Sequence, residues 1–354
     1  MKFNELNTEI TLEAHSFSAL GAFLCSNNYS RCAVITSEPM ASLLLPDVLP
    51  YLENPLVMTL QVSEEKKTLQ TVESCWETMR DNGLDRYSLL ISLGGGVISD
   101  ITGFAAACYM RGIDCVHIPT TLLGMIDGAL GGKNGVNLGP NKNYIGTFHQ
   151  PKLVAINLDC LDMLPARELK SGFAEIIKIA AVCDAKLFEF LELNTESLLK
   201  KSDDELLWVI ERACHLKMRI VTQDANENNV RSMLNFGHTF GHALEGLMNY
   251  QGLLHGEAVA IGIMCAANLA EKLGYCQPEV VQRIQRLCQA FELPITLPSE
   301  IDPERLVDLM MADKKAFQGS LTLVLPQAIG MGDKFTNVSK EDILSSLLSE
   351  VCYG

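Results

Sequence analysis

The sequence predicts an α/β protein in two parts, a parallel sheet with helices on its faces followed by a helical region. In the first part, short apolar runs of β-type residues alternate with stretches whose apolar residues recur at helical spacing. This alternation is typical of a parallel sheet. From Leu164 onward nearly every segment has helical periodicity. We therefore place the domains at residues 1–163 and 164–354, lengths at which each can bury its own core.

The expected strands and helices follow one another in a regular order. The strands are Ala33–Thr36, Leu56–Leu60, Tyr87–Leu93, Cys115–Ile118 and Leu153–Ile156. Helical patterns between them cover Ser63–Asn82 and Val97–Tyr109. A helix follows Pro165, and later helices are expected at about residues 203–222, 237–250, 256–273, 278–291 and 303–312. One short β segment, Ser320–Leu325, interrupts this helical part.

Composition and charge narrow the class of protein. Of 354 residues, 48% are hydrophobic and 20% are charged, which fits a folded globular protein rather than a disordered one. The net charge is −15 and no basic run or basic-aromatic stripe occurs, so nucleic-acid binding is not expected. An anionic ligand would have to be held by a local cluster of Lys and Arg.

Signals for secretion or membrane insertion are not expected. The N-terminal stretch M-K-F-N-E-L-N has no apolar signal-peptide core, and the apolar run Ala258–Ala267 is too short to span a bilayer. The 12 cysteines are scattered through apolar segments without a C-x-x-C pair, which suits reduced thiols better than a disulfide framework. We therefore expect a cytoplasmic protein that does not enter membranes.

Three glycines, Gly94–Gly96, fall between a buried strand and a helix that begins at Val97. At such a position backbone amides and the helix dipole can receive a phosphate, although a plain turn would have the same sequence. Asp100 lies in the first helical turn, where its carboxylate could bond a hydroxyl group. Glu64 and Lys67 flank an earlier helix start on the same expected edge of the sheet.

The segment Asp127–Asn143 is rich in glycine and asparagine. With so many glycines it is expected to be irregular rather than helix or strand. Its two lysines, Lys133 and Lys142, stand among asparagines, a composition suited to wrapping an anion or a polyol. A flexible linker is the alternative, but the apolar residues Ile126 and Ile145 would anchor the segment at both ends.

Glu175 and Lys178 are three residues apart and share one helical face. A solvent-exposed ion pair is the ordinary interpretation of this spacing. The surrounding sequence, G-F-A-E-I-I-K-I, makes the helix apolar nearly all round, which favours a buried pair.

Three of the seven histidines lie close together in the sequence. His238 and His242 are four residues apart and share a helical face, while His255 directly precedes the next helical pattern. Small neighbours, Gly237 and Gly241, would leave room near that face. Imidazoles from two adjacent helices commonly bind a metal ion, often with a carboxylate. Spacing alone nominates His238 and His242 as ligands, and ordinary hydrogen-bonded histidines are the alternative.

The glycine, lysine and histidine motifs together make the chain resemble the 3-dehydroquinate synthase family of the sugar-phosphate cyclase superfamily. The resemblance extends over nearly the whole chain. Its blocks are G-G-G-V-I-S-D (94–100), Y-M-R-G-I (109–113), P-T-T-L-L (119–123), G-G-K-N-G-V-N (131–137), K-N-Y-I-G-T-F-H-Q-P (142–151), G-F-A-E-I-I-K (172–178), N-F-G-H-T-F-G-H (235–242) and L-H-G-E-A-V (254–259). It implies an N-terminal Rossmann-like NAD-binding domain, a C-terminal all-α metal-binding domain, an active site between them and a homodimer.

The resemblance also assigns residues. It implies zinc (or cobalt) on Glu175, His238 and His255, against the pair that spacing nominates, and leaves His242 to the substrate phosphate and to proton handling. The residues that match the family's NAD site are Glu64, Lys67, Gly94, Gly95, Gly96, Val97, Asp100, Thr120, Thr121, Lys133 and Lys142, with the turn Cys160, Leu161, Asp162 and Met163 near the adenine. Those that match its substrate pocket are Asp127, Lys133, Asn143, Lys178, Lys217, Glu227, Arg231, Asn235, His242 and one of Lys314 and Lys315. Arg111 matches an arginine that reaches the partner subunit's site.

The reaction implied converts 3-deoxy-D-arabino-heptulosonate 7-phosphate, an anionic sugar phosphate, to 3-dehydroquinate and phosphate in the shikimate pathway. NAD oxidises one ring hydroxyl, which acidifies the neighbouring C–H and lets phosphate leave. Reduction, ring opening and an intramolecular aldol closure follow. The metal acts as a Lewis acid on a hydroxyl pair, and the lysines with Arg231 hold carboxylate and phosphate.

The nearest alternatives belong to the same superfamily. They are amino-dehydroquinate, valiolone-type and deoxyinosose synthases, and metal-dependent polyol dehydrogenases. The other cyclases typically diverge at Lys217, Arg231, Asn235 and His242, where this chain keeps the dehydroquinate-type set. A catalytically silent metal-binding protein would have lost polar pocket residues. Departures from the family pattern, such as Asn134 in G-G-K-N-G, remove no proposed ligand.

Overall fold

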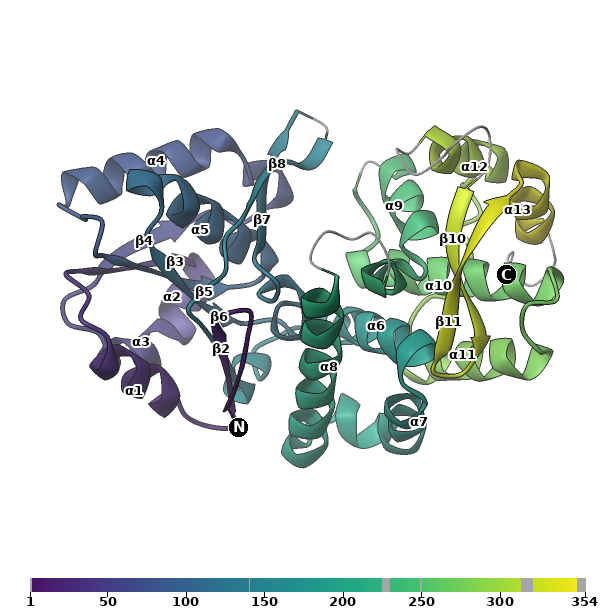
Figure 1. Cartoon of the computed structure of the whole chain (residues 1–354), viewed down its shortest axis with the longest axis horizontal. Coiled ribbons are helices and arrows are strands. Elements are labelled where there is room, and N and C mark those ends of the chain that lie inside the picture. Colours follow the sequence, from purple (N-terminus) through teal and green to yellow (C-terminus); the bar gives the residue numbers. More distant parts are fainter. Residues whose placement is uncertain (1, 140, 225–229, 249, 313–320, 349–354) are drawn as a thin grey trace. The chain divides into compact units, whose positions relative to one another are not determined.

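The computed structural model describes residues 2–139, 141–224, 230–248, 250–312 and 321–348 (Figure 1). The chain divides into two compact units. The first comprises Met1–Leu164 and Leu206–Cys214, and the second comprises Pro165–Glu205 and His215–Gly354. The helical segment Leu206–Cys214 therefore groups with the first unit, although it follows the start of the second unit in the sequence. A single boundary in the sequence cannot describe this division. The domain division at residue 163 stays a prediction.

A seven-stranded sheet forms the centre of the first unit. Its strands are β1 (Lys2–Glu5), β2 (Thr8–Glu13), β3 (Cys32–Ser37), β4 (Leu56–Leu60), β5 (Leu89–Gly94), β6 (Asp114–Pro119) and β9 (Leu153–Asn157), in the order β1-β2-β9-β6-β5-β3-β4. Only β1 runs antiparallel to its neighbour, and the other pairs are parallel. The five strands expected from the sequence are all present, which confirms the α/β class. The β1–β2 pair was not expected.

Helices cover both faces of this sheet (Figure 1). On one face lie α4 (Leu69–Asp81) and α5 (Gly96–Cys108), whose apolar residues form a core with β3, β4, β5 and β6. The indole Nε1–H of Trp76 donates to the carbonyl oxygen of Ala105 at 3.0 Å and joins the two helices. On the other face lie α1 (Ser18–Ser26), α2 (Glu38–Leu43) and α3 (Leu45–Val48).

The glycine-rich segment is more regular than expected. It contains a π-helical turn, η4 (Gly124–Gly128), and a two-stranded hairpin of β7 (Lys133–Leu138) and β8 (Asn141–Phe148). The expectation that Asp127–Asn143 is irregular is therefore wrong. The reason is a close approach of the strands, because a Cβ on Gly146 would lie 2.6 Å from the carbonyl oxygen of Asn134. Asn134 is itself structural, since its buried amide donates to two backbone carbonyls.

The second unit is mainly helical. Its helices are α6 (Ala166–Cys183), α7 (Ala185–Leu199), α8 (Asp203–Gln223), α9 (His238–Leu247), α10 (His255–Lys272), α11 (Pro278–Ala290), α12 (Pro303–Ala312) and α13 (Lys340–Leu347), and Leu206–Cys214 of α8 belongs to the first unit. The helices α6 and α10 are buried along most of their length. Among the described helices, none combines the length and hydropathy that crossing a membrane requires.

One antiparallel strand pair corrects the expectation of an all-α second domain. β10 (Leu321–Ala328) and β11 (Met331–Val338) form a hairpin that lies against α10 and α6 (Figure 1). The sequence showed only the first strand, because β11 reads M-G-D-K-F-T-N-V and lacks the apolar alternation of a half-buried strand. Tertiary packing rather than local pattern therefore holds it.

A buried histidine makes the stability of the first unit depend on pH. His117 on β6 is paired in register with Ser92 on β5, and its Nδ1 lies 2.7 Å from the Ser92 hydroxyl. Burial, with a smaller effect of His149, lowers the pKa of His117 from 6.5 to about 4. Between these values the unfolded chain binds the proton and the folded chain does not. Stability is therefore fully present above pH 6.5 and falls as the pH falls toward 4.

We predict that His117 contributes a loss of about 2 kcal/mol in the free energy of unfolding between pH 7 and pH 5. Urea titrations at the two pH values measure it. His117→Gln removes this titration and should reduce the pH dependence, whereas His215→Gln, which removes an exposed imidazole of α8, should not. Equal pH dependence in the wild type and His117→Gln would show that His117 is not the source.

Candidate metal centre

Helix α6 carries a carboxylate and an ammonium group into an apolar interior. Glu175 and Lys178 are 2% and 3% exposed, and Lys178 Nζ donates to Glu175 Oε2. The expectation of a buried pair is confirmed. A buried charge is tolerated only when it is paired or bound to a metal, so one oxygen of Glu175 is accounted for.

The other oxygen of Glu175 is not. Glu175 Oε1 is buried and, within the described residues, accepts no hydrogen bond. His238 Nε2 lies 3.4 Å from it and His255 Nε2 lies 3.6 Å from it. Ligand atoms about 2.0–2.1 Å from one tetrahedral ion lie about 3.3–3.4 Å from one another. The oxygen is therefore spaced from each imidazole nitrogen about as two ligands of one ion are, and one ligand atom from each of the three residues lies within 4.8 Å of the others. An ion would satisfy the orphaned oxygen.

The remaining nitrogen of each imidazole has its own acceptor. His238 Nδ1 lies 3.4 Å from the carbonyl oxygen of Phe236, and His255 Nδ1 lies 3.4 Å from both carboxylate oxygens of Glu245. A proton on Nδ1 alone would leave the lone pair of Nε2 on each ring directed at Glu175. This is the arrangement in which histidines bind metals in proteins.

Close packing of α9 on α10 brings the two histidine-bearing helix starts together. Gly262 of α10 lies against the turn before α9, because a Cβ there would be 2.1 Å from the carbonyl oxygen of Gly237. Gly241 likewise faces the backbone of Ala258. We expected Gly237 and Gly241 to leave room near the histidines. The structure shows that the space they leave is filled by the backbone of α10.

The first turn of α10 is also tied to α6. The guanidinium of Arg167 binds Glu257 through two bonds of 2.6 Å, and its NH2 group donates to the carbonyl oxygen of Gly252. Glu257 in turn accepts from the backbone N–H of Leu254, and the N–H of Gly256 donates to Ser171 on α6. These bonds fix the loop before His255 relative to the helix that carries Glu175.

The neighbouring charges set the protonation states of the cluster. Burial alone raises the pKa of Glu175, but Lys178 and the two imidazoles outweigh it and hold this pKa well below its ordinary range. Burial and Lys178 lower the pKa of His238 far below its ordinary value, so this imidazole is neutral at pH 7. Burial also lowers the pKa of His255, but the carboxylates of Glu175 and Glu245 outweigh it and raise the pKa to about 10. An entering ion therefore displaces a proton from His255.

His242 stands beside this cluster and is exposed. Its ring centroid lies 5.1 Å from that of His238 and 5.9 Å from that of His255. With Glu245 and His255 it forms a second group of potential ligand atoms, all within 4.8 Å of one another. The pair nominated by spacing is thus close in space as well as in sequence. The ligand set Glu175, His238 and His255 stays a prediction, favoured by the orphaned oxygen.

Other predicted substrate residues of the second unit are largely buried. Lys217 and Arg231 are 7% and 5% exposed, and Asn235 is half-buried. Arg231 opens the 3-10 turn η6 (Val230–Asn235), where its backbone N–H donates to the buried carboxylate of Asp224 at 3.1 Å. Sequence reasoning missed Asp224, although an aspartate at the end of a helix is a common turn signal. Glu227, Lys314 and Lys315 lie outside the described residues.

In the first unit the predicted cofactor residues follow the carboxyl ends of parallel strands. Glu64 and Lys67 come after β4, the glycines after β5, Thr120 and Thr121 after β6, and Cys160–Met163 after β9. The chain runs from β3 outward to β4 and from β5 the other way to β6, so a crevice is expected between the ends of β3 and β5. Gly96 borders open space there, since an added Cβ would meet no atom within 4 Å.

Lys67 joins two of the predicted groups. Its buried ammonium donates to Asp100 and, at 2.5 Å, to the amide oxygen of Asn143 on β8. Asn137 extends this network, because its amide donates to Glu64 and accepts from the backbone N–H of Asn143. Burial raises the pKa of Asp100, and Lys67 opposes this effect. Predicted NAD residues and a predicted substrate residue therefore share one hydrogen-bonded cluster.

The remaining predicted residues of the first unit lie on several different elements. Asp127 is half-buried on η4, Lys133 is exposed on β7 and Lys142 is half-buried on β8. Arg111 is exposed with a φ of 71°. The side chains of Cys160 and Leu161 are buried in the core. At these two positions only the backbone could contact a cofactor, whereas the side chain of Asp162 is exposed and that of Met163 is half-buried.

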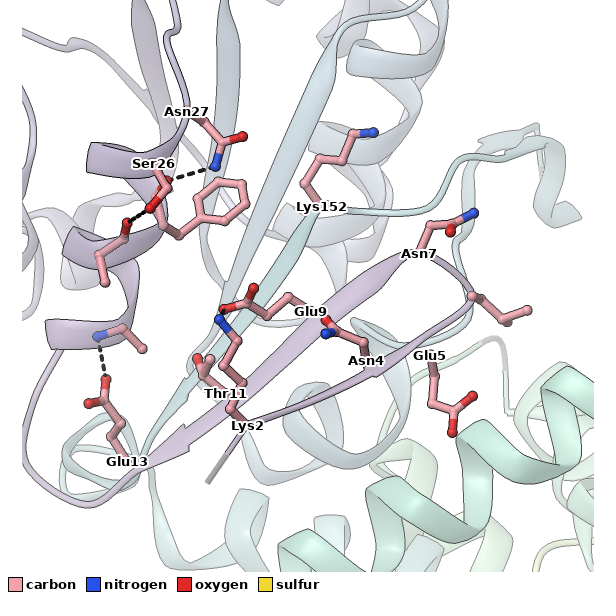
Figure 2. Close-up of a pocket in the computed structure, with 14 residues that line it drawn as sticks. Lys2, Asn4, Glu5, Asn7, Glu9, Thr11, Glu13, Ser26, Asn27 and Lys152 are labelled. Carbon is pink, nitrogen blue, oxygen red and sulfur yellow. Dashed lines mark hydrogen bonds and ion pairs between the residues drawn. The ribbon is translucent and has the colours of Figure 1, made fainter.

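A wide recess of about 1060 Å³ lies elsewhere in the first unit, beside α1 and the β1–β2 pair (Figure 2). None of the predicted site residues lines it. Several of its charged groups already bind other groups of the protein: Lys2 Nζ lies 2.7 Å from Glu9 Oε1, and Glu13 accepts from the hydroxyl of Ser18 and the backbone N–H of Ala19. Size alone therefore does not mark the functional site.

Comparisons with known proteins match both halves of the chain. A family model for the N-terminal region of 3-dehydroquinate synthase matches residues 57–171, and one for the C-terminal region matches residues 172–316. The 3-dehydroquinate synthase of Shewanella sp. (strain MR-4) is 43% identical over 316 residues, which cover 88% of each chain.

Two solved structures share the fold along almost their full length. The 2-epi-5-epi-valiolone synthase of Streptomyces hygroscopicus subsp. jinggangensis 5008, with NAD+ and Zn2+ bound, has a TM-score of 0.88 and 29% identity, over 98% of this chain and 97% of that one. A 2-deoxy-scyllo-inosose synthase complexed with carbaglucose-6-phosphate, NAD+ and Co2+ has a TM-score of 0.88 and 25% identity, over 98% and 99%.

The packing of α9 on α10 predicts the effect of one methyl group. In Gly262→Ala the new Cβ meets backbone atoms of Gly237 and Gly241 that cannot yield. We expect a loss of about 1–3 kcal/mol in the free energy of unfolding and weaker zinc binding. Gly246→Ala on α9 is the control, because its Cβ meets nothing within 4 Å. Denaturant titrations in which Gly262→Ala matches the wild type would refute the role given to this contact.

Proposed function

The chain belongs to the 3-dehydroquinate synthase family, and we propose that it converts 3-deoxy-D-arabino-heptulosonate 7-phosphate to 3-dehydroquinate and phosphate. The observation that carries the proposal is a buried carboxylate oxygen that accepts no hydrogen bond from the described residues and is faced by two imidazoles, in a chain whose two halves match the two parts of the family. The enzyme is then a carbon–oxygen lyase that eliminates phosphate.

The residues fit a metal ion and a dinucleotide. Glu175, His238 and His255 would hold zinc or cobalt, which supplies Lewis-acid activation of a hydroxyl pair. The relatives with NAD+ and Zn2+ or Co2+ bound support this choice. NAD, which supplies and recovers a hydride, would lie along the carboxyl edge of the sheet with its pyrophosphate at the start of α5. There Gly96 leaves open space and Asp100 offers a carboxylate to a hydroxyl.

The chain's own groups then have separate tasks. Lys178, Lys217 and Arg231 are buried cations of the second unit, suited to a substrate that carries both carboxylate and phosphate. His242 offers an exposed imidazole beside the metal centre, where it can hold or move a proton. Lys67 ties Asp100 to Asn143 and so holds the β7–β8 hairpin against the cofactor residues.

Further features are proposed from the resemblance. The enzyme works as a cytoplasmic homodimer, with Arg111 reaching the partner subunit's site. A left-handed backbone at Arg111 and at its neighbour Met110, with φ of 71° and 47°, projects this exposed turn from the end of α5. Such strained conformations cluster at functional positions.

Other superfamily activities remain the alternatives to be tested. The solved neighbours include a valiolone synthase and a deoxyinosose synthase, and the second is complexed with carbaglucose-6-phosphate, a ligand without a carboxylate. A metal-dependent polyol dehydrogenase would release its reduced cofactor. Lys217, Arg231, Asn235 and His242 favour the carboxylate-bearing substrate, since together they provide two fixed cations, an amide and an imidazole.

Incubation with the heptulosonate phosphate, NAD and zinc tests the proposal. We expect release of one phosphate per dehydroquinate formed, without accumulation of NADH, because the cofactor is restored in each turnover. Chelation of the metal should abolish both products. Sedoheptulose 7-phosphate, which lacks the carboxylate, serves as the matched control substrate. Steady NADH accumulation, or faster turnover of sedoheptulose 7-phosphate, would assign the chain to another branch of the superfamily.

A further inference from the structure

One buried carboxylate of the second unit has no part in the proposed reaction. Glu245 is 6% exposed and lies on α9. It follows His238 by seven residues and His242 by three, so all three side chains lie on one stripe of the helix. That stripe faces the start of α10, where His255 stands.

The carboxylate of Glu245 faces Nδ1 of the His255 ring. Both of its oxygens lie 3.4 Å from His255 Nδ1, while His255 Nε2 lies 3.6 Å from Glu175 Oε1. The imidazole therefore stands between two buried carboxylates, one at each ring nitrogen. His238 is held in a comparable way, with the Phe236 carbonyl at Nδ1 and Glu175 at Nε2.

We propose that Glu245 is a positioning residue that orients His255 for the metal. By accepting the Nδ1–H hydrogen bond it fixes the tautomer whose Nε2 lone pair points at Glu175, and it increases the basicity of that nitrogen. The proposal rests on the metal centre of the proposed function. Glu245 would then bind a metal ligand through a hydrogen bond and would not itself bind the metal.

Zinc affinity measures this role without any turnover. The apoprotein is titrated with zinc against a chromophoric chelator, and the thermal midpoint of each apoprotein is recorded beside it. Four variants are compared with the wild type: Glu245→Leu, Glu245→Gln, Glu175→Gln and Glu271→Gln. Glu271 also lies on α10, sixteen residues beyond His255 and so about 24 Å along the helix, and it serves as the control carboxylate.

Glu245→Leu should weaken zinc binding about 10- to 100-fold, the usual effect of losing the partner of a metal-bound histidine. Glu245→Gln should lose less, because its amide oxygen can still accept from Nδ1–H. Glu175→Gln should lose more than either, and Glu271→Gln should match the wild type. Zinc affinity should therefore decrease from the wild type to Glu245→Gln to Glu245→Leu. This order distinguishes a positioning role from space filling, because leucine fills the volume of the carboxylate without accepting a hydrogen bond.

Two results would overturn the role of Glu245 while leaving the proposed function intact. Unchanged zinc affinity in Glu245→Leu would show that His255 needs no acceptor. A loss in Glu245→Gln as large as that in Glu175→Gln would make Glu245 itself a ligand, in the group with His242 and His255. A wild-type chain that binds no zinc would instead overturn the proposed metal centre, and this proposal with it.

Discussion

A buried carboxylate oxygen for which the described residues provide no hydrogen bond is the constraint on which the second unit depends. Leaving such an atom unsatisfied costs about 1–3 kcal/mol or more. The position of Glu175 Oε1 is therefore explained best by a ligand that binds it. Lys178 donates a charge-assisted hydrogen bond to Glu175 Oε2. The Nε2 atoms of His238 and His255 lie near Glu175 Oε1.

Much of the surrounding structure serves to bring those donors together. The glycine contacts place α9 against α10, and the bonds from Arg167 to Glu257 and Gly252 hold the turn before His255 on α6. The orientation of each imidazole is fixed by a hydrogen-bond acceptor at its Nδ1. The centre is thus built from three helices whose relative positions are set by glycine contacts with backbone and by side-chain hydrogen bonds, which suits a site that must keep its geometry during turnover.

Sequence reasoning predicted the elements with strong periodicity and missed those held by packing. The parallel strands and the helices from α8 to α12 were found, because their apolar spacing is regular. The sequence predicts an irregular loop where the β7–β8 hairpin lies. Glycines that allow two strands to approach closely cannot be distinguished, in the sequence, from glycines that interrupt regular structure. The strand β11 was missed because few of its residues are apolar. The burial of Glu175 and Lys178 followed from the apolar surroundings alone.

The candidate site was only partly accessible to the sequence. Spacing favoured His238 and His242, and the resemblance was needed to favour Glu175 and His255, because helix spacing carries no information about contacts between helices. Glu245 was overlooked, although its spacing of seven residues from His238 placed it on the same stripe. The hydrogen bonds of Lys67 to Asp100 and Asn143 link segments far apart in the chain and could not be seen in any local pattern.

The most direct test of the central claim is a crystal structure of the zinc-loaded protein with anomalous data at the zinc edge. We expect a single strong peak in the second unit, within about 2.0–2.2 Å of Glu175 Oε1, His238 Nε2 and His255 Nε2. A peak bound instead by His242, Glu245 and His255, with Glu175 outside its coordination shell, would contradict it.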